Sequence, residues 1–404
     1  MKEVTRCTLE DAIRLITNRV KPVMEIEEVE LMEALGRVLG EDVTSPHNQP
    51  PFPRSPLDGY ALQSASSEGA TKEHGVVLKV IEEIFAGSVG SKTVKAGEAV
   101  RIMTGAPIPE GADCVLRQED TDYGEDEVEI YQQLKPYDNY CFIGEDYKKG
   151  ECLLKKGSCL EAPEIGLLAS FGRKTVKVTR CPKIHLITTG DELVMPGNPL
   201  QPGKIYDSNL YSIGVRLKEL GCLATMHNHI EDEAKEVAEQ IREASKTADV
   251  VITTGGVSVG KKDIIHEVLT ILGAEKLFWK IDLKPGTPTL CGMYENTLII
   301  GLSGNPFGAI TNLEILVRPV LAYMTGKEKL IPIRKKGVLE NDFGKPSKVR
   351  RFVRAIYEDG VVRLPQGSHS SGVLSSMRGC NCLIDIPGGS EAVRKGDEVT
   401  VCLL

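Results

Sequence analysis

The sequence lacks several features that would point to common functional classes. Only 5% of its 404 residues are aromatic and one is tryptophan, which argues against a surface that stacks single-stranded bases. Acidic side chains outnumber basic ones and give a net charge of -8, so a general nucleic-acid binder is not expected. No run of about 18 apolar residues is present, and we therefore expect no transmembrane helix and no membrane partner.

The first residues and the cysteines indicate a cytoplasmic protein. The segment MKEVTRCTLEDAIRL lacks the apolar stretch and the cleavage site of a signal peptide. The 11 cysteines are scattered and include no C-x-x-C pair, which argues against structural zinc. Cys380 and Cys382 are expected to lie on one face of a strand as small buried residues. His227 and His229 have no obvious third metal ligand nearby.

The length allows two to four domains at about 150 residues each. In the first half of the chain the sequence pattern changes from helical to proline-rich and then to short strands. Residues 8–20 predict an amphipathic helix capped by Thr8, and residues 28–39 predict a second helix. The segment 45–56 holds five prolines, which excludes a regular helix. Short strands separated by turns then predict a small β domain to about residue 140. Residues 141–179 add strands and a short helix near 164–170.

From about residue 180 the pattern alternates between strands and helices. The strands KIHLITTG, DVVITTGG and NTLIIGLSGNP are each followed by helical segments, which we place at 209–220, 233–246, 263–272 and 307–324. This alternation predicts an α/β domain with a doubly wound, mostly parallel sheet, on which the N-terminal helix could pack. The last 70 residues return to β structure, with a hairpin turn at Asp359-Gly360 and a closing strand of a small barrel.

Three turns that follow the buried strands are the first candidates for a ligand site. They are the segments 188–192, 253–260 and 301–306, rich in Gly, Thr and Ser. The carboxyl ends of parallel strands share one edge, where glycine turns expose backbone N–H groups to anionic ligands. An anion or phosphate site is therefore predicted, although such turns favour Gly and Thr for structural reasons as well. Neither G-x-x-x-x-G-K-[ST] nor G-x-G-x-x-G occurs.

Acidic and basic residues near these turns could complete the site. Glu192, Asp207, Asp232 and Asp263 lie beside the turns, while Asp58 and Asp146 lie in the first half of the chain. Carboxylates beside a phosphate site are the ligands that Mg²⁺ requires, but each could equally cap a helix or a turn. Lys280 and Lys284, four residues apart on a predicted strand, could hold an oxyanion or form a solvated pair. No nucleophile motif is present, which favours chemistry by metal and positioning.

Six segments together resemble a known family. They are PPFPRSPLDGYAL, VRIMTGAPIPEGADCV, LITTGDELVMPG with KIYDSN, DVVITTGGVSVGKKD, FWKIDLKPGTP and GLSGNPFGA. In this order they are similar to the MoeA family of molybdopterin molybdenumtransferases, which includes the C-terminal domain of gephyrin. The resemblance covers essentially the whole chain.

The resemblance implies four domains and a homodimer. A MogA-like α/β domain would comprise residues 1–25 and 180–325, and a mixed connecting domain residues 26–48 and 141–179. A small β domain would comprise residues 49–140, and a C-terminal β-barrel-like domain residues 330–404. The active cleft would lie between the MogA-like domain of one subunit and the small β domain of the other.

The implied reaction is Mg²⁺-dependent insertion of molybdate into adenylylated molybdopterin, which releases AMP and molybdenum cofactor. The resemblance gives catalytic roles to Asp58, Thr104, Asp146, Glu192, Asp263, Lys280 and Lys284. Substrate binding is expected at Thr189, Gly190, Asp232, Thr254, Gly255, Gly256, Ser258, Ser303, Gly304, Asn305, Arg354, Ser375 and Ser376. Metal binding is expected at Glu192, Asp232 and Asp263. Molybdopterin adenylyltransferase and acceptor molybdoenzymes are possible partners.

One departure from the family pattern leaves alternatives open. Many members have K-P-G-K-P where this chain has Lys284-Pro285-Gly286-Thr287-Pro288, so a lysine that could help to hold molybdate is a threonine here. Pro53 also stands where many bacterial members have Asp. A paralogue that inserts tungsten is one alternative, and a gephyrin-like scaffold or cofactor carrier without catalysis is the other.

Overall fold

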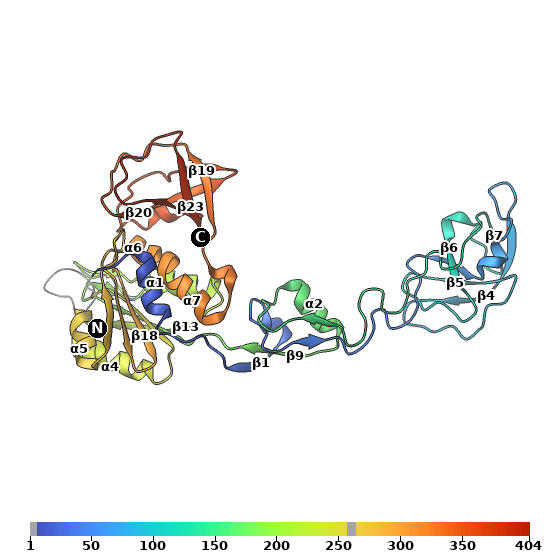
Figure 1. Ribbon diagram of the computed structural model, residues 1–404, viewed down its shortest axis with the longest axis horizontal. Coiled ribbons are helices and arrows are strands. Elements are labelled where there is room, and N and C mark those ends of the chain that lie inside the picture. The colour runs from blue at the N-terminus through green and yellow to red at the C-terminus, as the bar shows by residue number, and fades with distance from the viewer. Residues whose placement is uncertain (1–5, 257–263) are drawn as a thin grey trace. The chain divides into compact units, whose positions relative to one another are not determined.

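The computed structural model describes residues 6–256 and 264–404, with the backbone alone at 228–230 (Figure 1). The chain forms two compact units. The first, which we call the core unit, contains the described residues up to Gly40 together with Gly157–Ile165 and Lys174–Leu404. The second, the insert unit, contains Glu41–Lys156 and Gly166–Arg173. The finer division into four domains with the bounds given above stays a prediction.

A six-stranded sheet forms the centre of the core unit. Its strand order is β13-β10-β14-β18-β17-β15. The parallel strands are β13 (Ala224–Ile230), β10 (Ile184–Thr189), β14 (Val250–Thr254) and β18 (Thr297–Leu302). The antiparallel strands at the other end are β17 (Leu290–Tyr294) and β15 (Glu275–Trp279). The predicted doubly wound, mostly parallel sheet is therefore confirmed.

Helices cover both faces of this sheet, because successive side chains of its buried strands point to opposite sides. Ile252 packs in the same apolar cluster as α1 (Leu9–Thr17), α3 (Asn209–Glu219), α6 (Pro306–Asn312) and α7 (Arg318–Thr325). Val251 packs in the opposite cluster with α4 (Ala234–Ser245) and α5 (Ile264–Leu272). The N-terminal helix thus joins a core formed 170 or more residues later, as expected, and the hydroxyl of Thr8 caps it by accepting from the backbone nitrogen of Asp11 at 3.1 Å.

The helix predicted over residues 307–324 is present, with a π-helical turn inside it. A π-helical turn, Leu313–Val317, joins α6 to α7 and gives one helical run, Pro306–Thr325. Among the described residues this run alone is long and apolar enough to cross a membrane by length and composition. In this structure 89% of its apolar window is buried inside the protein, so it serves here as a core helix.

The helix predicted over residues 28–39 is wrong. Residues Ile26–Glu30 form β1, which pairs antiparallel with β9 (Thr175–Thr179), and only a short 3-10 turn, Leu31–Ala34, follows. The apolar spacing misled the prediction, because Met32 and Leu35 are 86% and 66% exposed and pack on nothing that would support a helix. The short helix α2 (Ala162–Ser170) forms as expected.

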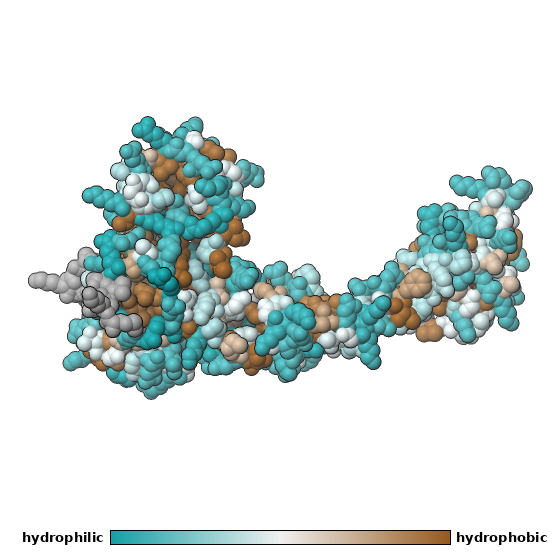
Figure 2. Space-filling view, in the orientation of Figure 1, coloured by the Kyte–Doolittle hydropathy of each residue, from teal (hydrophilic) through white to brown (hydrophobic). Residues whose placement is uncertain are grey.

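The C-terminal region closes into a five-stranded barrel. Its strands are β19 (Arg334–Leu339), β20 (Arg350–Glu358), β21 (Val361–Arg363), β22 (Cys382–Ile386) and β23 (Glu398–Leu403). Pairing of β20 with β22 closes the ring, and Asp359 and Gly360, both with positive φ, form the predicted hairpin turn. An apolar cluster fills the interior, while the visible face of the barrel is largely hydrophilic (Figure 2). Cys382 is buried as expected, but Cys380 precedes the strand and is half-buried.

The barrel is connected to the central sheet by a short parallel pairing of β16 (Leu283–Lys284) with β20. A second short pair, β11 (Leu193–Val194) with β12 (Ile205–Tyr206), lies in the chain between β10 and α3. Both pairs belong to segments that carry predicted site residues, and β16 places Lys284 at the start of the loop before Pro288.

The insert unit is built from β strands. A five-stranded sheet has the order β6-β3-β5-β4-β7, with apolar clusters on both of its faces. Its strands are β3 (Gly59–Leu62), β4 (Val76–Ile84), β5 (Glu98–Ile102), β6 (Cys114–Arg117) and β7 (Glu127–Ile130). The strands β2 (Val43–Thr44) and β8 (Cys152–Leu154) form a separate pair. The predicted small β domain is thus present.

Candidate active site

The three glycine-containing turns lie at one edge of the central sheet. Thr188 of β10 is paired in register with Thr254 of β14, which in turn is paired with Leu302 of β18. Because the three strands are parallel neighbours, the turns that follow them leave the sheet side by side. The predicted gathering of these turns is confirmed.

Glycine is required where the turns approach each other. Gly255 has a φ of +93°, and a Cβ atom there would lie 2.1 Å from the carbonyl oxygen of Thr189. Gly304, in the third turn, lies against Gly255, with a Cβ position 3.6 Å from the Cα atom of Gly255. The side-chain amide of Asn209 in α3 donates to the carbonyl oxygen of Gly304 at 2.8 Å and fixes this third turn. Only a residue without a side chain fits at Gly255, whereas a Cβ atom at Gly304 would make an ordinary contact.

Buried hydroxyl groups lie at the same edge. The Oγ1 atoms of Thr189 and Thr253 are both buried and have no hydrogen-bond partner among the described residues. The hydroxyl of Thr188, in contrast, donates to Asp207, which also accepts from the backbone nitrogen of Leu210 at the start of α3. Asp207 therefore caps a helix, whereas the Thr189 hydroxyl remains available as a donor at this edge.

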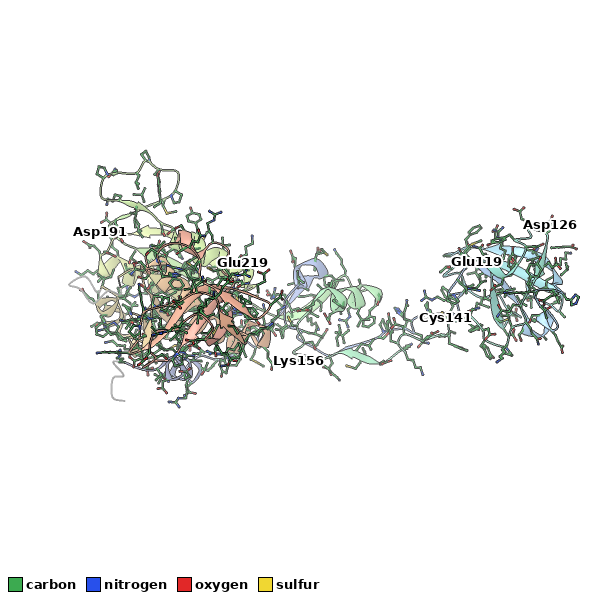
Figure 3. All side chains as sticks on the ribbon, turned by 90° about the horizontal axis from the view of Figure 1, so that it is seen from above. Glu119, Asp126, Cys141, Lys156, Asp191 and Glu219 are labelled. Atoms are coloured by element: carbon green, nitrogen blue, oxygen red, sulfur yellow. The ribbon has the colours of Figure 1, made fainter. Side chains whose placement is uncertain are left out.

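Of the acidic residues predicted beside the turns, the structure describes Glu192, Asp207 and Asp232. The carboxylate of Glu192 lies against Gly190, 2.8–3.1 Å from where a Cβ atom of that glycine would be. The backbone nitrogen of Asp232 donates to the carboxylate of Asp191 at 3.2 Å, which joins the loops after β10 and β13; Asp191 is labelled in Figure 3. Asp263 and Ser258 lie outside the described residues. Within residues 6–256 and 264–404, no three ligating side chains converge on one point.

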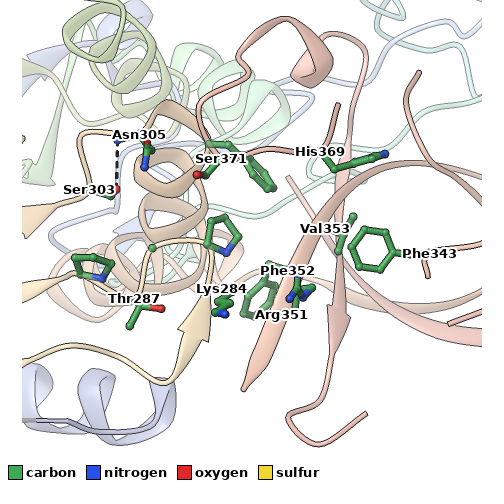
Figure 4. Close-up of a pocket in the computed structure, with 14 residues that line it drawn as sticks. Lys284, Thr287, Ser303, Asn305, Phe343, Arg351, Phe352, Val353, His369 and Ser371 are labelled. Carbon is green, nitrogen blue, oxygen red and sulfur yellow. Dashed lines mark hydrogen bonds between the residues drawn. The ribbon is translucent and has the colours of Figure 1, made fainter. Parts of the chain in front are cut away.

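A cavity of about 300 Å³ lies beside this edge, within the core unit. Figure 4 shows its walls: the loop from Lys284 to Pro288, the turn from Ser303 to Asn305, and Arg351 to Val353 of β20. Phe307, Phe343, His369 and Ser371 complete the lining. The described lining residues include Lys284, Arg351 and several hydroxyl groups but no carboxylate, so the cavity favours an anion.

The two predicted lysines have different environments. Lys284 is exposed and lines the cavity. Lys280 has a φ of +75° just after β15 ends, and its ammonium group lies 3.8 Å from the centre of the Trp279 ring. The expectation that both lie on one face of a strand is wrong, because the chain turns at Lys280 before β16 begins at Leu283.

Arg354 is buried behind the cavity wall. It is 1% exposed, its Nη2 atom donates to the carbonyl oxygens of Ser368 and Ser370 at 2.9 Å each, and its guanidinium lies 4.2 Å from the centre of the Phe307 ring. Its Nε and Nη1 atoms have no partner among the described residues, and burial lowers its pKa. The Ser376 hydroxyl also donates to Ser368, at 3.1 Å, whereas Ser375 is exposed.

Sequence reasoning missed Arg351, His369 and Ser371. The Arg354 contacts hold the 368–371 segment, which brings His369 and Ser371 to the cavity. Burial lowers the pKa of His369, and the charges of Arg354 and Lys345 lower it further. No local pattern marks His369 or Ser371. For Arg351, the basic pair Arg350-Arg351 in a strand of the apolar barrel was an available signal.

The predicted residues of the insert unit form one local arrangement. Asp58 immediately precedes β3, and Thr104 lies just after β5, two strands that pair antiparallel. Both the backbone nitrogen and the hydroxyl of Thr104 donate to the Asp58 carboxylate, and these bonds hold the pKa of Asp58 below its usual value. Asp146 is exposed, and its backbone nitrogen donates to Gln49 at 2.9 Å.

Comparison with known sequences decides the family. Residues 7–172 match the MoeA N-terminal region (domains I and II), residues 185–323 a probable molybdopterin binding domain, and residues 336–404 the MoeA C-terminal region (domain IV). A curated molybdopterin molybdenumtransferase of Staphylococcus aureus (strain COL) is 36% identical over 398 residues, 98% of this chain and 95% of that protein.

The chain belongs to the MoeA family.

Other MoeA proteins agree along the whole chain. The molybdopterin molybdenumtransferase of Staphylococcus epidermidis (strain ATCC 12228) is 35% identical over 402 residues, 99% of this chain and 96% of that protein. The crystal structure of a molybdopterin biosynthesis MoeA protein from Pyrococcus horikoshii has a TM-score of 0.82 and 33% identity, covering 99% of both chains. The predicted family and multidomain fold are confirmed, and with them the class of protein, a transferase of molybdenum cofactor biosynthesis.

Proposed function

We propose that this MoeA-family chain transfers molybdenum from molybdate to adenylylated molybdopterin and releases AMP and molybdenum cofactor. The observation that carries the proposal is the position of the turn from Ser303 to Asn305. Gly304 lies against Gly255 at the glycine edge of the sheet, while Ser303 and Asn305 line the cationic cavity. A phosphate site at this edge and an oxyanion site in the cavity would therefore share one turn, which would hold molybdate close to the pterin whose dithiolene takes up the metal while the adenylate is cleaved as AMP.

The cavity supplies what a tetrahedral dianion needs. Lys284 and Arg351 bring positive charge, and the hydroxyls of Ser303 and Ser371 can donate hydrogen bonds. Its volume of about 300 Å³ exceeds that of one tetrahedral oxyanion, which leaves room for the dithiolene end of the pterin. Lys280 lies outside this lining, and we assign it no contact with the oxyanion.

The glycine edge would hold the phosphate groups of the adenylylated pterin. The buried Thr189 hydroxyl and the backbone of Gly190 and of Thr254–Gly256 present donors there, with Ser258 as a further candidate from the sequence. Donors held by a rigid sheet need no rearrangement when charge develops on a phosphate oxygen, which stabilises the transition state. The residues thus act by binding and orientation rather than as nucleophiles.

The oxygen-rich donor set at this edge fits Mg²⁺, which binds one or two carboxylates and otherwise phosphate and water. The loops after β10 and β13 are joined through Asp191 and Asp232, and they bring carboxylates next to the phosphate edge. Glu192, Asp232 and Asp263 would hold the ion. When bound, Mg²⁺ would neutralise phosphate charge and polarise the bond to AMP.

We further propose a cytoplasmic homodimer in which the second copy brings Asp58, Thr104 and Asp146 to the cleft. The fixed, partly exposed carboxylate of Asp58 supports this role, because two donors from Thr104 keep it ionised and oriented. Molybdopterin adenylyltransferase would supply the substrate, and acceptor molybdoenzymes would take the product.

Turnover with purified protein tests the proposal. The protein is incubated with adenylylated molybdopterin, Mg²⁺ and molybdate, and both AMP release and molybdenum retained on the pterin are followed. We expect both products in equal amounts, and Arg351→Gln should raise KM for molybdate about tenfold or more. Arg363→Gln, an exposed barrel arginine paired with Glu340 and Glu358, is the matched control. Tight pterin binding without AMP release would favour the scaffold or carrier function instead.

Tungstate is the second candidate substrate, because it has the shape and charge of molybdate and because Thr287 stands where many family members have a lysine. The Thr287 hydroxyl donates its hydrogen bond within the loop, to the carbonyl oxygen of Leu283. This side chain therefore adds no charge to the cavity. Running the same assay with tungstate, and with Thr287→Lys, measures the preference directly. Turnover with tungstate alone would keep the family and change the substrate.

A further inference from the structure

The loop that carries Lys284 is fixed from behind by one buried amide. Asn312, the last residue of α6, is completely buried, and its Nδ2 atom donates to the carbonyl oxygen of Gly286 at 2.9 Å. The same Nδ2 atom donates to the Oγ1 atom of Thr289 at 2.5 Å, and the Thr289 hydroxyl donates to the carbonyl oxygen of Gly286 at 2.9 Å. Three hydrogen bonds therefore link Asn312, Gly286 and Thr289, and Gly286 lies two residues after Lys284.

The fit between Asn312 and the loop leaves no space for adjustment. Gly286 has a φ of +93°, and a Cβ atom there would lie 2.6 Å from both the Nδ2 and the Oδ1 atoms of Asn312. The backbone of the loop thus packs directly on the amide. A buried donor between two acceptors, in contact with a glycine, allows one loop conformation and excludes others.

The helix around Asn312 is irregular at this point. The π-helical turn Leu313–Val317 begins immediately after it, and such turns occur often at functional sites. Phe307, five residues earlier in the same helix, lines the cavity, whereas Asn312 does not. The amide therefore acts on the cavity only through the loop from Lys284 to Pro288.

We infer that Asn312 is a positioning residue for the oxyanion cavity, which holds the Lys284 loop in its binding conformation and so sets the affinity for molybdate or tungstate without contacting either ion. The inference rests on the proposed function of the cavity. Because the loop contributes Lys284 to the cavity while the glycine edge would hold the phosphate groups of the pterin, loss of the amide should weaken oxyanion binding much more than pterin binding.

The test compares Asn312→Ala, Asn312→Asp and Thr289→Val in the full-length protein. Sodium molybdate and sodium tungstate are titrated separately by calorimetry, and KM for molybdate, KM for adenylylated molybdopterin and kcat are measured in turnover. We expect Kd and KM for the oxyanion to rise about tenfold in the Asn312 variants and less in Thr289→Val. Both kcat at saturating molybdate and KM for the pterin should stay within about twofold of the wild type.

Asn381→Asp is the matched control, because the Asn381 Nδ2 atom also donates to a main-chain carbonyl oxygen, that of Tyr357 at 2.9 Å, in the barrel of the same unit. It should leave oxyanion binding unchanged. Should the Asn312 variants fail to fold, Thr289→Val removes two of the three bonds, keeps the one from Asn312 to Gly286, and gives the same direction of change. The double variant Asn312→Ala with Thr289→Val should be non-additive in Kd.

The outcomes separate this inference from the proposed function. Variants that lose thermal stability but bind molybdate as tightly as the wild type would overturn the positioning role and leave the cavity assignment intact. Equal loss of affinity for oxyanion and pterin would also overturn it, since that pattern reports a general structural effect. A wild-type protein that binds neither oxyanion would overturn both.

Discussion

One oxygen atom of the Asp58 carboxylate accepts two hydrogen bonds from Thr104, from its backbone nitrogen and from its hydroxyl, each 2.7 Å long. The two donors lie on the turn after β5, and Asp58 lies at the start of the neighbouring β3. The two bonds leave the second carboxylate oxygen without a bond from Thr104, and the Asp58 residue is partly exposed. This geometry presents an oriented negative charge, which leads to the first prediction.

Asp58→Ala should reduce molybdenum insertion by about 100-fold or more, because a fixed carboxylate at a reacting centre typically contributes at least this factor. Folding and oligomeric state should be retained, since the side chain is partly exposed. Turnover and size-exclusion chromatography measure the two effects. Asp126→Asn, an exposed carboxylate of the same unit, is the control (Figure 3). Normal turnover by the Asp58 variant would refute the assignment, and the sequence predicts the same sensitivity for Asp263→Ala.

Removing Glu314 should destabilise the core unit. Its carboxylate is buried between Arg216, with a closest N–O distance of 2.5 Å, and Arg318, at 2.9 Å. Glu314→Ala leaves the buried Arg318 without its counter-charge and Arg216 with only the exposed Glu219, and it should cost about 3–5 kcal/mol of the free energy of unfolding. Denaturant unfolding measures this loss. Glu219→Ala, which removes the exposed partner of Arg216, should cost at most about 1 kcal/mol.

Gly255→Ala should disrupt the glycine edge. The new Cβ atom would lie 2.1 Å from the carbonyl oxygen of Thr189, so one of the two turns must move. Gly273→Ala is the control, because Gly273 also has a positive φ but has open space around it. We expect Gly255→Ala to cost about 1–3 kcal/mol more than the control and to weaken binding of adenylylated molybdopterin. Equal stability and equal pterin affinity in the two variants would contradict the close approach.

The stability of the core unit should fall in mild acid because of a histidine pair. His185 and His227, on the adjacent strands β10 and β13, have facing ring nitrogens 2.7 Å apart. Burial lowers the pKa of both, and the charge of His227 lowers that of His185 further. The unfolded chain, with a histidine pKa of about 6.5, therefore binds protons first as the pH falls, and stability is lost below about pH 6.5.

Measuring the free energy of unfolding between about pH 5 and pH 8 checks this sign. His227→Gln should flatten the slope on the acid side in part, because His185 and the buried His369, whose pKa is also lowered, still titrate. His74→Gln, at an exposed histidine of the insert unit, should leave the slope unchanged. A wild-type protein that becomes more stable as the pH falls from about 7 to 5 would contradict the assignment of lowered pKa values.

Local patterns in the sequence were sufficient to predict the regular elements and the sheet edge. Buried strands such as Val250–Thr254 are each followed by a glycine turn and a helix. This alternation predicts a parallel sheet, because each helix carries the chain back across the sheet before the next strand begins. The three turns, the Thr8 cap and the Asp359-Gly360 hairpin follow from spacing alone. The same reasoning failed at residues 28–39, where Val29 pairs with Val176 and tertiary pairing with a distant strand decided the structure.

Only the tertiary structure decided which side chains share the oxyanion cavity. Lys284, Ser303, Arg351 and His369 come from four segments that meet because β16 pairs with β20 and the Arg354 contacts hold the 368–371 segment. Those contacts depend on long-range packing, which leaves no periodic trace in the sequence. The same packing turned Lys280 away from Lys284 and placed Asn312 behind the loop, although neither effect follows from residue spacing. The sequence thus determined the sheet and the edge where its glycine turns meet, while burial and distant pairing determined the cavity.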